Sequence, residues 1–358
     1  MPTHELEIIS VTNNEVTDER DGGLGRMVED ARLAEASGVD TLLIGYGSTY
    51  PDGLVIGTSI LGATRRMRAL IAHRPGVVSP TVAARMFATL AVQSEGRVRI
   101  NVVAGGSPSD QLRDGDHVEH DMRYRRAIEY VSILRRLWSD ASPYTHAGEY
   151  YDLTKARLDL RPPTEWMPVI YMGGASEPAR EFAAASAESY MSWTEPVHAV
   201  KERFADIAER CARLGRPRPR FSVSMRLILG DTEDEAWRKA WDLAPGVRDG
   251  QNEVRGHRDD VGRSRQVELV KQSLVHDERL WLGLTAASGG MGNTGALVGT
   301  PEQIHDALMR YVVEAGADAF VLTGPDGFHQ PLPAGFISGL KAAASGIVAG
   351  RFATAESS

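Results

Sequence analysis

The sequence predicts a (β/α)8 TIM barrel, an eight-stranded parallel barrel surrounded by helices, with insertions. Eight short apolar runs alternate along the chain with longer segments of helical periodicity. The apolar runs are continuous, as expected for parallel strands that are buried on both faces. Eight such units favour a closed barrel over an open doubly wound sheet. We therefore expect residues 1–358 to form one domain.

Each expected strand is bounded by turn residues or by the start of a helix. The helix after the first strand should end at Gly38, and Pro80 should open a helix that stops at Gly96. After the seventh strand, Asp231 or Thr232 can cap a helix whose acidic first residues suit its dipole. The expected strands are residues 6–12, 41–44, 70–72, 98–103, 168–172, 189–192, 221–229 and 319–323.

Two segments are too long to be plain connections. Residues 144–163 contain GEYYDL and RLDL, which predict a small hairpin outside the barrel. Residues 245–300 contain a charged run, a helix and a glycine-rich stretch, and they follow the helix after the seventh strand. We expect this second insertion to form a mobile lid over the active face of the barrel. A solvated extension is the alternative interpretation.

The composition narrows the class of protein and of partner. With 42% hydrophobic and 25% charged residues, the chain matches a globular protein with a large core. A net charge of −8 without any basic stripe argues against a nucleic-acid partner. The sequence has no apolar run of membrane-spanning length, and we do not expect its first residues, MPTHELEII, to act as a signal peptide. Its single cysteine, Cys211, fits a reducing compartment, so we expect a cytoplasmic protein that does not enter membranes.

In such a barrel, ligands bind at the carboxyl ends of the strands and at the loops that follow. The residues expected there include no carboxylate pair placed for glycoside hydrolysis and no cluster with metal-ligand spacing. The hydrolase motif GxSxG is absent, so the chemistry is expected to come from a bound cofactor. The groups at these ends are Asn13, Asn14, Tyr46, Gly47, His73, Arg74, Asn101, Ser176, Trp193, Arg226 and residues 324–329.

Three loops compete as a binding site for a cofactor phosphate. Residues 173–176 (GGAS) precede a helix, so backbone N–H groups and the Ser176 hydroxyl could bind an anion there. The alternative is that Ser176 only caps that helix. Residues 323–327 (TGPDG) form the loop that carries phosphate in many barrels. Residues 290–295 match GxGxxG but neither follow a strand nor open a helix, so a hinge is the better interpretation.

Two charged or titratable residues lie in apolar strand contexts. Arg226 is in the middle of SVSMRLIL, so it must point into the barrel or be paired, because an unpaired buried charge is costly. It can bind an anion or stabilise developing negative charge, and a structural ion pair is the alternative. His73 ends a strand, where it is either a catalytic group or a hydrogen-bonded core histidine.

Several motifs together carry a resemblance to a known family. They run in order from about residue 40 to residue 325 and so cover most of the chain. The chain resembles the bacterial-luciferase-like flavin monooxygenases, most closely their alkanesulfonate monooxygenase branch. The matching motifs are SPTVAARMFATL, NVVAGGSPSD, HDMRY, GEYYDL, IYMGGASEPARE, SWTEP, DTEDEAW and GALVGTPEQI.

The resemblance implies a barrel that binds reduced FMN, supplied by a separate flavin reductase, and then activates O2. Family positions carried over to this sequence place Asn101 and Asp110 at the flavin, with Tyr46 and Gly47 lining it. The same resemblance implies a homodimer or homotetramer. The residues implied to hold the ribityl phosphate are Arg123, Tyr124, Gly174, Ala175 and Ser176.

The pocket expected for a sulfonate is largely replaced, which bears on the substrate. Of the residues typical of that branch, only Trp193 is clearly kept. Other residues stand at the remaining pocket positions, namely Asn13, Tyr50, Ser224, Arg226, Ser288 and Pro325. The substrate is therefore expected to be a small organic compound, such as a sulfonate, another organosulfur compound or a related one. We assign catalytic roles to Arg226, Trp193 and His73.

The sequence predicts a two-component monooxygenase that transfers one oxygen atom from O2 to this substrate. An FMN- or deazaflavin-dependent oxidoreductase that transfers hydride is the first alternative. A flavin-binding protein without turnover is the second alternative.

Overall fold

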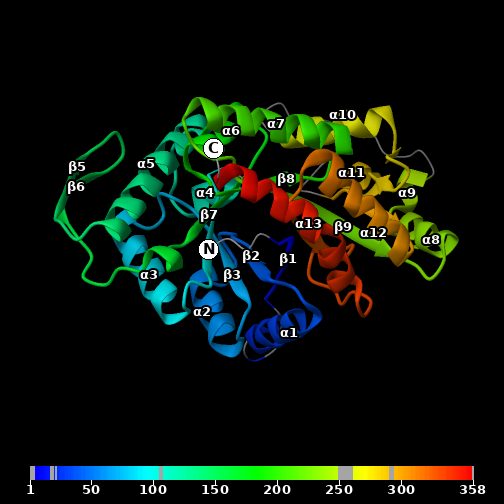
Figure 1. The fold of residues 1–358 in the computed structure, drawn as a ribbon, viewed down its shortest axis with the longest axis horizontal. Helices are drawn as coiled ribbons and strands as arrows, with labels where there is room; N and C mark the ends of the chain where they lie inside the picture. Colours follow the sequence, from blue (N-terminus) through cyan, green and yellow to red (C-terminus); the bar gives the residue numbers. More distant parts are fainter. Residues whose placement is uncertain are drawn as a thin grey trace.

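The computed structural model describes residues 5–16, 20, 22–104, 108–248, 261–289 and 294–356. Eight parallel strands pair in a closed ring, because the last strand pairs with the first as well as with its other neighbour (Figure 1). Each of them coincides with an expected strand, so the predicted TIM barrel is confirmed. In ring order they are β1 (Glu7–Val11), β2 (Thr41–Ile44), β3 (Arg68–His73), β4 (Val98–Val102), β7 (Val169–Gly173), β8 (Ser189–Trp193), β9 (Arg220–Leu229) and β13 (Ala319–Thr323).

Helices surround this barrel, and their ends follow the capping rules used for the prediction. Pro80 is the first residue of its helix, and the Thr232 hydroxyl accepts a hydrogen bond from Glu235 N–H. Among the described residues, no helix is long and apolar enough to cross a membrane. The main helices are α1 (Leu24–Ser37), α2 (Gly53–Ala63), α3 (Pro80–Gln93), α4 (Pro108–Arg113), α5 (His120–Ser139), α6 (Glu177–Ser186), α7 (Val197–Arg213), α8 (Glu233–Leu243), α12 (Pro301–Arg310) and α13 (Phe336–Glu356). Two short helical segments are η1 (Thr164–Trp166), before β7, and η2 (Tyr311–Ala315), before β13.

Strand alternation divides the core into two parts. One face of each strand packs against the helices and forms most of the hydrophobic core, with Ile8, Ile71 and Ile100 among its members. The opposite face points into the barrel, where Ile9, Leu70, Tyr171 and Val321 form a small inner cluster. This parity decides which residues near the strand ends can face a ligand inside the barrel.

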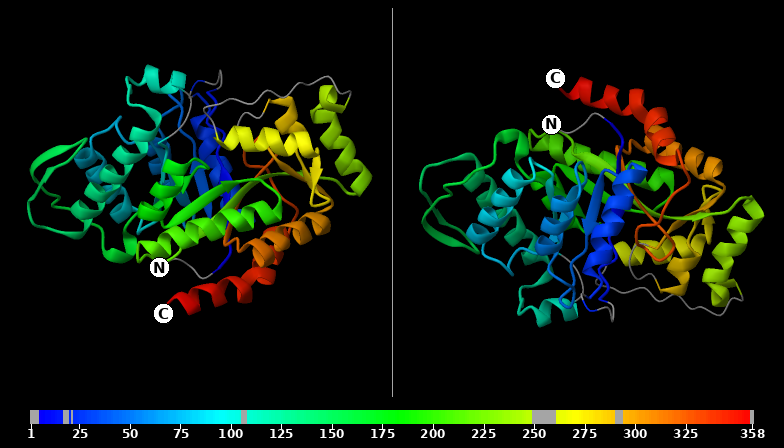
Figure 2. Two further views of the ribbon diagram at one scale, coloured as in Figure 1. Left: turned by 90° about the horizontal axis from the view of Figure 1, so that it is seen from above. Right: turned by 90° about the horizontal axis from the view of Figure 1, so that it is seen from below.

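Charged groups close the amino-terminal end of the barrel. The Glu7 carboxylate accepts hydrogen bonds from Thr41 and from Tyr171, at 2.6 and 2.9 Å. Burial raises the pKa of Glu7, but Arg220 and Arg68 outweigh this effect and leave that pKa below its usual value. Helix α13 packs at the same end, where Arg351 pairs with the fully buried Asp318. Figure 2 shows α13 in red at one end of the barrel and α4 at the other.

The first insertion forms a hairpin of β5 (Tyr144–Ala147) and β6 (Asp152–Ala156), which lies at one end of the long axis of the molecule (Figure 1). The Glu129 carboxylate of α5 holds it by accepting hydrogen bonds from Tyr150 N–H and Tyr151 N–H, both at 3.0 Å. The side chain of His146 lies 2.9 Å from the same carboxylate.

The second insertion contains structure that the sequence prediction did not include. Its strand β12 (Ala296–Gly299) pairs in parallel with the second half of β9, and β11 (Leu280–Trp281) and β10 (Val275–His276) extend the sheet outward. Residues 249–260 and 290–293, which include most of the charged run and of the GxGxxG match, lie outside the described residues. The closing of this insertion over the barrel stays a prediction. Its helices are α9 (Pro245–Arg248), α10 (Val261–Gln272) and α11 (Gly283–Ala287).

Helix α10 is fixed to the barrel at the end of β8. Arg265 Nη2 lies 2.7 Å from the Glu195 carboxylate, which is only 2% exposed and also binds Arg203. The Gln266 amide donates to the carbonyl oxygen of Thr194 at 2.6 Å. The described base of the insertion is therefore bound to the residues that directly follow Trp193.

Candidate active site at the carboxyl end of the barrel

The predicted site residues, apart from His73, lie on strand ends at the carboxyl end of the barrel or on the loops and helices that follow those ends. Val98, Ile100 and Val102 belong to the core under the helices, so Asn101 between them points into the barrel. The same parity turns Trp193 of β8 and Arg226 of β9 inward. Three strands thus direct an amide, an indole and a guanidinium group toward one interior.

The loop between β7 and α6 approaches α6 too closely for a side chain at Gly174. Gly174 has a φ of 147°, and a Cβ added there would lie 2.7 Å from the Ala179 Cβ and 3.7 Å from the Tyr124 hydroxyl. A side chain at position 174 would therefore clash with the start of α6, on a side that lies near the Tyr124 hydroxyl. The structure places Tyr124, Gly174, Ala175 and Ser176 around the positive end of a ten-residue helix.

Ser176 caps α6, as the alternative interpretation expected. Its hydroxyl oxygen accepts a hydrogen bond from Ala179 N–H at 3.4 Å. Because the Ser176 oxygen is the acceptor in this bond, the hydroxyl hydrogen is not used by it, and capping does not exclude donation to an anion. Tyr124 is 5% exposed and packs edge-on against the His120 ring, which limits where its hydroxyl can point.

Arg123 precedes Tyr124 on α5 and is held by backbone carbonyl groups. Its Nε donates to Ala104 O at 2.9 Å and its Nη1 to Val118 O at 2.7 Å. Burial lowers the pKa of Arg123, and the nearby Asp116 partly offsets that effect. Arg123 therefore ties together the two ends of the connection between β4 and α5. Its contact with a phosphate stays a prediction.

The loop after β2 is joined to this connection through Asp114 and Ser48, which the sequence analysis did not assign to the site. The Tyr46 hydroxyl donates to Asp114 at 2.7 Å, and Asp114 also binds Arg74 at 3.0 Å. The Asp110 carboxylate accepts a hydrogen bond from the Ser48 hydroxyl at 2.6 Å, which is the main reason that its pKa is lowered. That Tyr46 and Arg74 meet at Asp114 could have been found only from the register of β2 against β3.

Arg226 contacts the loop that follows the last barrel strand. Its Nη1 donates to the carbonyl oxygen of Pro325. A Cβ on Gly327, where φ is 94°, would lie only 3.0 Å from its Nη2. Burial lowers the pKa of Arg226 and the neighbouring Asp326 opposes that effect. The guanidinium group is thus half-buried at the mouth of the barrel, with a carboxylate nearby.

His73 lies apart from these groups, on the helix side of the barrel wall. Its Nε2 lies 2.8 Å from the Tyr130 hydroxyl, and its ring meets Phe87 edge-on at 5.2 Å. Burial lowers the pKa of His73 to about 4, with a small opposing effect of Asp52. This environment is that of a hydrogen-bonded core histidine, and it favours the structural interpretation of His73 over the catalytic one.

The lowered pKa of His73 predicts an acid-dependent loss of stability. Below pH 6.5 His73 binds a proton in the unfolded chain, whereas in the folded protein it stays neutral until about pH 4. The free energy of unfolding should therefore fall as the pH is lowered over this range. The full contribution is about 3 kcal/mol. In urea denaturation between pH 7.5 and pH 4.5, His73→Gln should show a flatter dependence than the wild type. Exposed His198 provides the control substitution, His198→Gln. An unchanged pH dependence with lost turnover at pH 7.5 would instead support catalysis.

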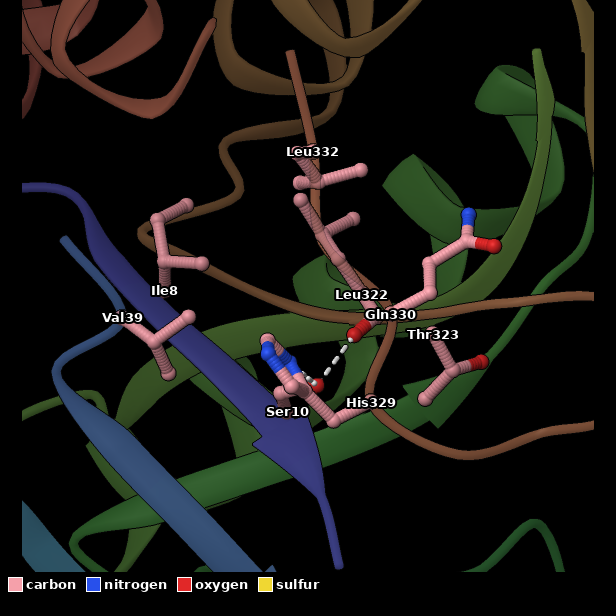
Figure 3. A pocket seen from close by; sticks show the side chains of 8 residues that line it. All are labelled: Ile8, Ser10, Val39, Leu322, Thr323, His329, Gln330 and Leu332. Carbon is pink, nitrogen blue, oxygen red and sulfur yellow. Dashed lines mark hydrogen bonds between the residues drawn. The ribbon is translucent and has the colours of Figure 1, made fainter. Parts of the chain in front are cut away.

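Two hollows lie away from the carboxyl end of the barrel. One lies outside the barrel wall between β1 and residues 329–332, where His329 Nδ1 lies 3.0 Å from the Ser10 hydroxyl (Figure 3). The other is an open surface hollow between α2 and α3 that includes Leu54 and Met86. Within the described ranges, no group of three or more acidic, histidine or cysteine side chains is placed to hold a metal ion.

Comparisons with known proteins agree with this fold. A family model described as luciferase-like monooxygenase matches residues 5–319. An EDTA monooxygenase from Chelativorans sp. BNC1 is 19% identical, with a TM-score of 0.73 over 97% of this chain and 94% of that one. A riboflavin lyase solved with modified FMN and riboflavin is also 19% identical, with a TM-score of 0.74 over 97% and 92% of the two chains. An F420-dependent secondary alcohol dehydrogenase is 19% identical, with a TM-score of 0.65 over 90% and 95%. These likenesses to solved structures show a shared fold.

Proposed function

Because the chain belongs to the luciferase-like monooxygenase family, we propose that it is the oxygenating component of a two-component monooxygenase. Reduced FMN would come from a separate flavin reductase, and one oxygen atom of O2 would enter a small organic substrate. The substrate class is a sulfonate, another organosulfur compound or a related compound. The riboflavin lyase of the same fold, which was solved with modified FMN, supports the choice of FMN.

The close approach of the Gly174 backbone to the start of α6 and to Tyr124 is the observation that carries this proposal. The ribityl phosphate of FMN is an anion, and the start of α6 offers backbone N–H groups together with the Ser176 and Tyr124 hydroxyls. A Cβ at position 174 would clash with Ala179 and push the loop away from this helix start, so the absence of a side chain there has a physical reason. The donor set fits a phosphate better than a neutral group.

The other inward residues have separate tasks in this proposal. Bound reduced FMN supplies the electrons with which O2 is activated. Asn101 and Trp193 line the interior and exclude water from the reacting region. Arg226 stabilises negative charge at the mouth or binds an anionic group of the substrate, and its half-burial strengthens either interaction.

The test supplies the cofactor without a partner enzyme. Photoreduced FMN is mixed anaerobically with the protein and a panel of sulfonates, thioethers and ketones, and 18O2-saturated buffer is then added. We expect one 18O atom in the product of at least one substrate. A mixture of NAD(P)H and oxidised FMN without a reductase should give no product. Steady oxygenation by that mixture would contradict a two-component system.

Hydride transfer is the second candidate because an F420-dependent dehydrogenase shares the fold. Fluorescence titration separates the two functions, since FMN and a deazaflavin such as F420 have distinct emission. Tighter binding of F420 than of FMN, with alcohol oxidation in the absence of O2, would replace the first proposal. Flavin binding without oxygen uptake on any substrate would instead indicate a binding protein.

The surface of α2 supports the expected homo-oligomer. Its sequence, GLVIGTSILGA, contains no charged residue, and Val55 on it is 63% exposed. An uncharged face can meet its own copy across a twofold axis without repulsion of like charges. Light scattering should therefore give a particle mass of two or four times the 39.0 kDa chain mass. Val55→Lys should shift the protein toward the monomer, whereas Val313→Lys, at a similarly exposed site, should not. A monomeric wild type would contradict the proposal.

A further inference from the structure

Three loops of the barrel meet at the carboxylate of Asp114. This residue lies in the connection between β4 and α5, directly after α4. Its Oδ2 accepts hydrogen bonds from the Tyr46 hydroxyl at 2.7 Å and from Arg74 Nη1 at 3.0 Å. Tyr46 follows β2 and Arg74 follows β3, so one oxygen atom joins three segments that are distant in the sequence.

Strand register explains why these residues meet. Strands β2 and β3 are parallel neighbours in which Ile44 lies beside Ile71. Tyr46 lies two residues after Ile44 and Arg74 lies three residues after Ile71, so the two side chains follow neighbouring strand ends. The Arg74 guanidinium carbon lies 4.4 Å from the centroid of the Tyr46 ring, within the range of a cation–π contact. Arg74 is only 3% exposed, so little water competes for this contact.

This arrangement uses the hydroxyl group of Tyr46 and leaves its ring as a rigid surface. The hydroxyl donates to Asp114, so its hydrogen is not available to a ligand. Burial and Asp114 together raise the pKa of Tyr46 to about 12, so it stays protonated at neutral pH. Arg74 covers part of the ring and limits its rotation.

We propose that Arg74 and Asp114 are positioning residues that hold Tyr46 as a fixed aromatic wall of the cofactor site. Tyr46 then acts through its ring and not through its hydroxyl. This inference rests on the proposed function, because it takes Tyr46 to line the bound flavin, as the family resemblance implies. The Arg74–Asp114–Tyr46 contact itself can be tested without any cofactor.

The first experiment observes the ring in the free protein. The chain is labelled with 3-fluorotyrosine, and the resonance that disappears in Tyr46→Phe identifies Tyr46. Arg74→Met and Asp114→Asn should each move this 19F resonance toward the position of unfolded tyrosine and narrow it. Arg74→Lys should restore part of the shift because it keeps the charge but not the planar contact. Arg113→Met is the control, since Arg113 lies on the same connection and binds Asp110. An unmoved resonance in Arg74→Met would overturn the inference.

The second experiment measures the affinity for FMN. Tyr46→Phe should keep the dissociation constant within about threefold of the wild type, because the ring remains. Tyr46→Leu should weaken binding at least tenfold, and Arg74→Met by about fivefold, with partial rescue in Arg74→Lys. If Tyr46→Phe is as damaging as Tyr46→Leu, the hydroxyl is needed and the inference is wrong.

The two experiments separate this inference from the proposed function. If the wild type does not bind FMN, the proposed function fails and the role of Tyr46 as a cofactor wall fails with it, even where the 19F shifts appear as expected. If the wild type binds FMN but the 19F resonance ignores Arg74 and Asp114, the proposed function survives and only the inference fails.

Discussion

Gly174→Ala should weaken the binding of FMN by roughly 100-fold. The substitution places a methyl group 2.7 Å from the Ala179 Cβ at a φ of 147°, which residues with a side chain rarely adopt. Backbone strain and overpacking each cost about 1–3 kcal/mol, so the loop must move away from its present position. Flavin fluorescence quenching measures the dissociation constant. Gly62→Ala on α2, where an added Cβ meets no atom within 4 Å, is the matched control and should bind FMN like the wild type.

Two milder variants test the same loop without moving its backbone. Ser176→Ala and Tyr124→Phe each remove one hydroxyl that could donate to the phosphate. Each should weaken FMN binding by about 1.5–3 kcal/mol, the value of a charge-assisted hydrogen bond. If all three variants bind FMN like the wild type, the loop serves only to cap α6.

Arg226→Met should lower the rate of oxygen transfer by roughly 100-fold to 1,000-fold, which is typical for the loss of one group that stabilises charge in a reaction. FMN affinity should change little because Arg226 lies on β9, away from the α6 loop. Arg226→Lys should recover part of the rate, since it keeps the charge without the planar guanidinium group. Single-turnover mixing with reduced FMN gives the rate per folded molecule.

The contact of Arg226 with Pro325 suggests a structural role as the alternative to the catalytic one. Arg226 also holds the last barrel loop through that carbonyl oxygen. A purely structural role predicts a lower melting temperature and an unchanged rate per folded molecule. In that case Arg226 only fixes the loop, and the catalytic assignment is wrong.

The barrel strands were predictable because short runs rich in apolar residues, such as TLLI of β2 and AFVLT of β13, alternate with helical segments. Strand β12 was missed, since ALVG is four residues long and directly follows a glycine-rich stretch. The 21-residue helix α13 was also missed, because GIVAG and the alanine-rich segment before it show no clear apolar stripe.

The site residues were predictable where the local sequence alone fixes their position. They were not predictable where their role depends on contacts with residues distant in the sequence. Gly174 and Ser176 stand directly before a helix, so their position follows from the local sequence. The role of Asp114 depends on Arg74 and Tyr46, which lie 40 and 68 residues away in the sequence. His73 depends on strand parity, and a shift of one residue would have turned it into the barrel.

Strand β9 is ten residues long, and its two halves belong to different partners. Its first residues pair with β8 and β13, whereas Arg226 to Leu229 also lie beside Ala296 to Gly299 of β12. Arg226 N–H donates to the carbonyl oxygen of Gly295 at 3.1 Å, so the backbone of this arginine is part of the junction. A chimera that exchanges the insertion between relatives must therefore keep the pairing of Ala296 with Arg226. If the grafted β12 pairs with β9 one residue out of register, its side chains will point to the opposite face of the sheet. The surroundings of Arg226 would then change even though every barrel residue is kept.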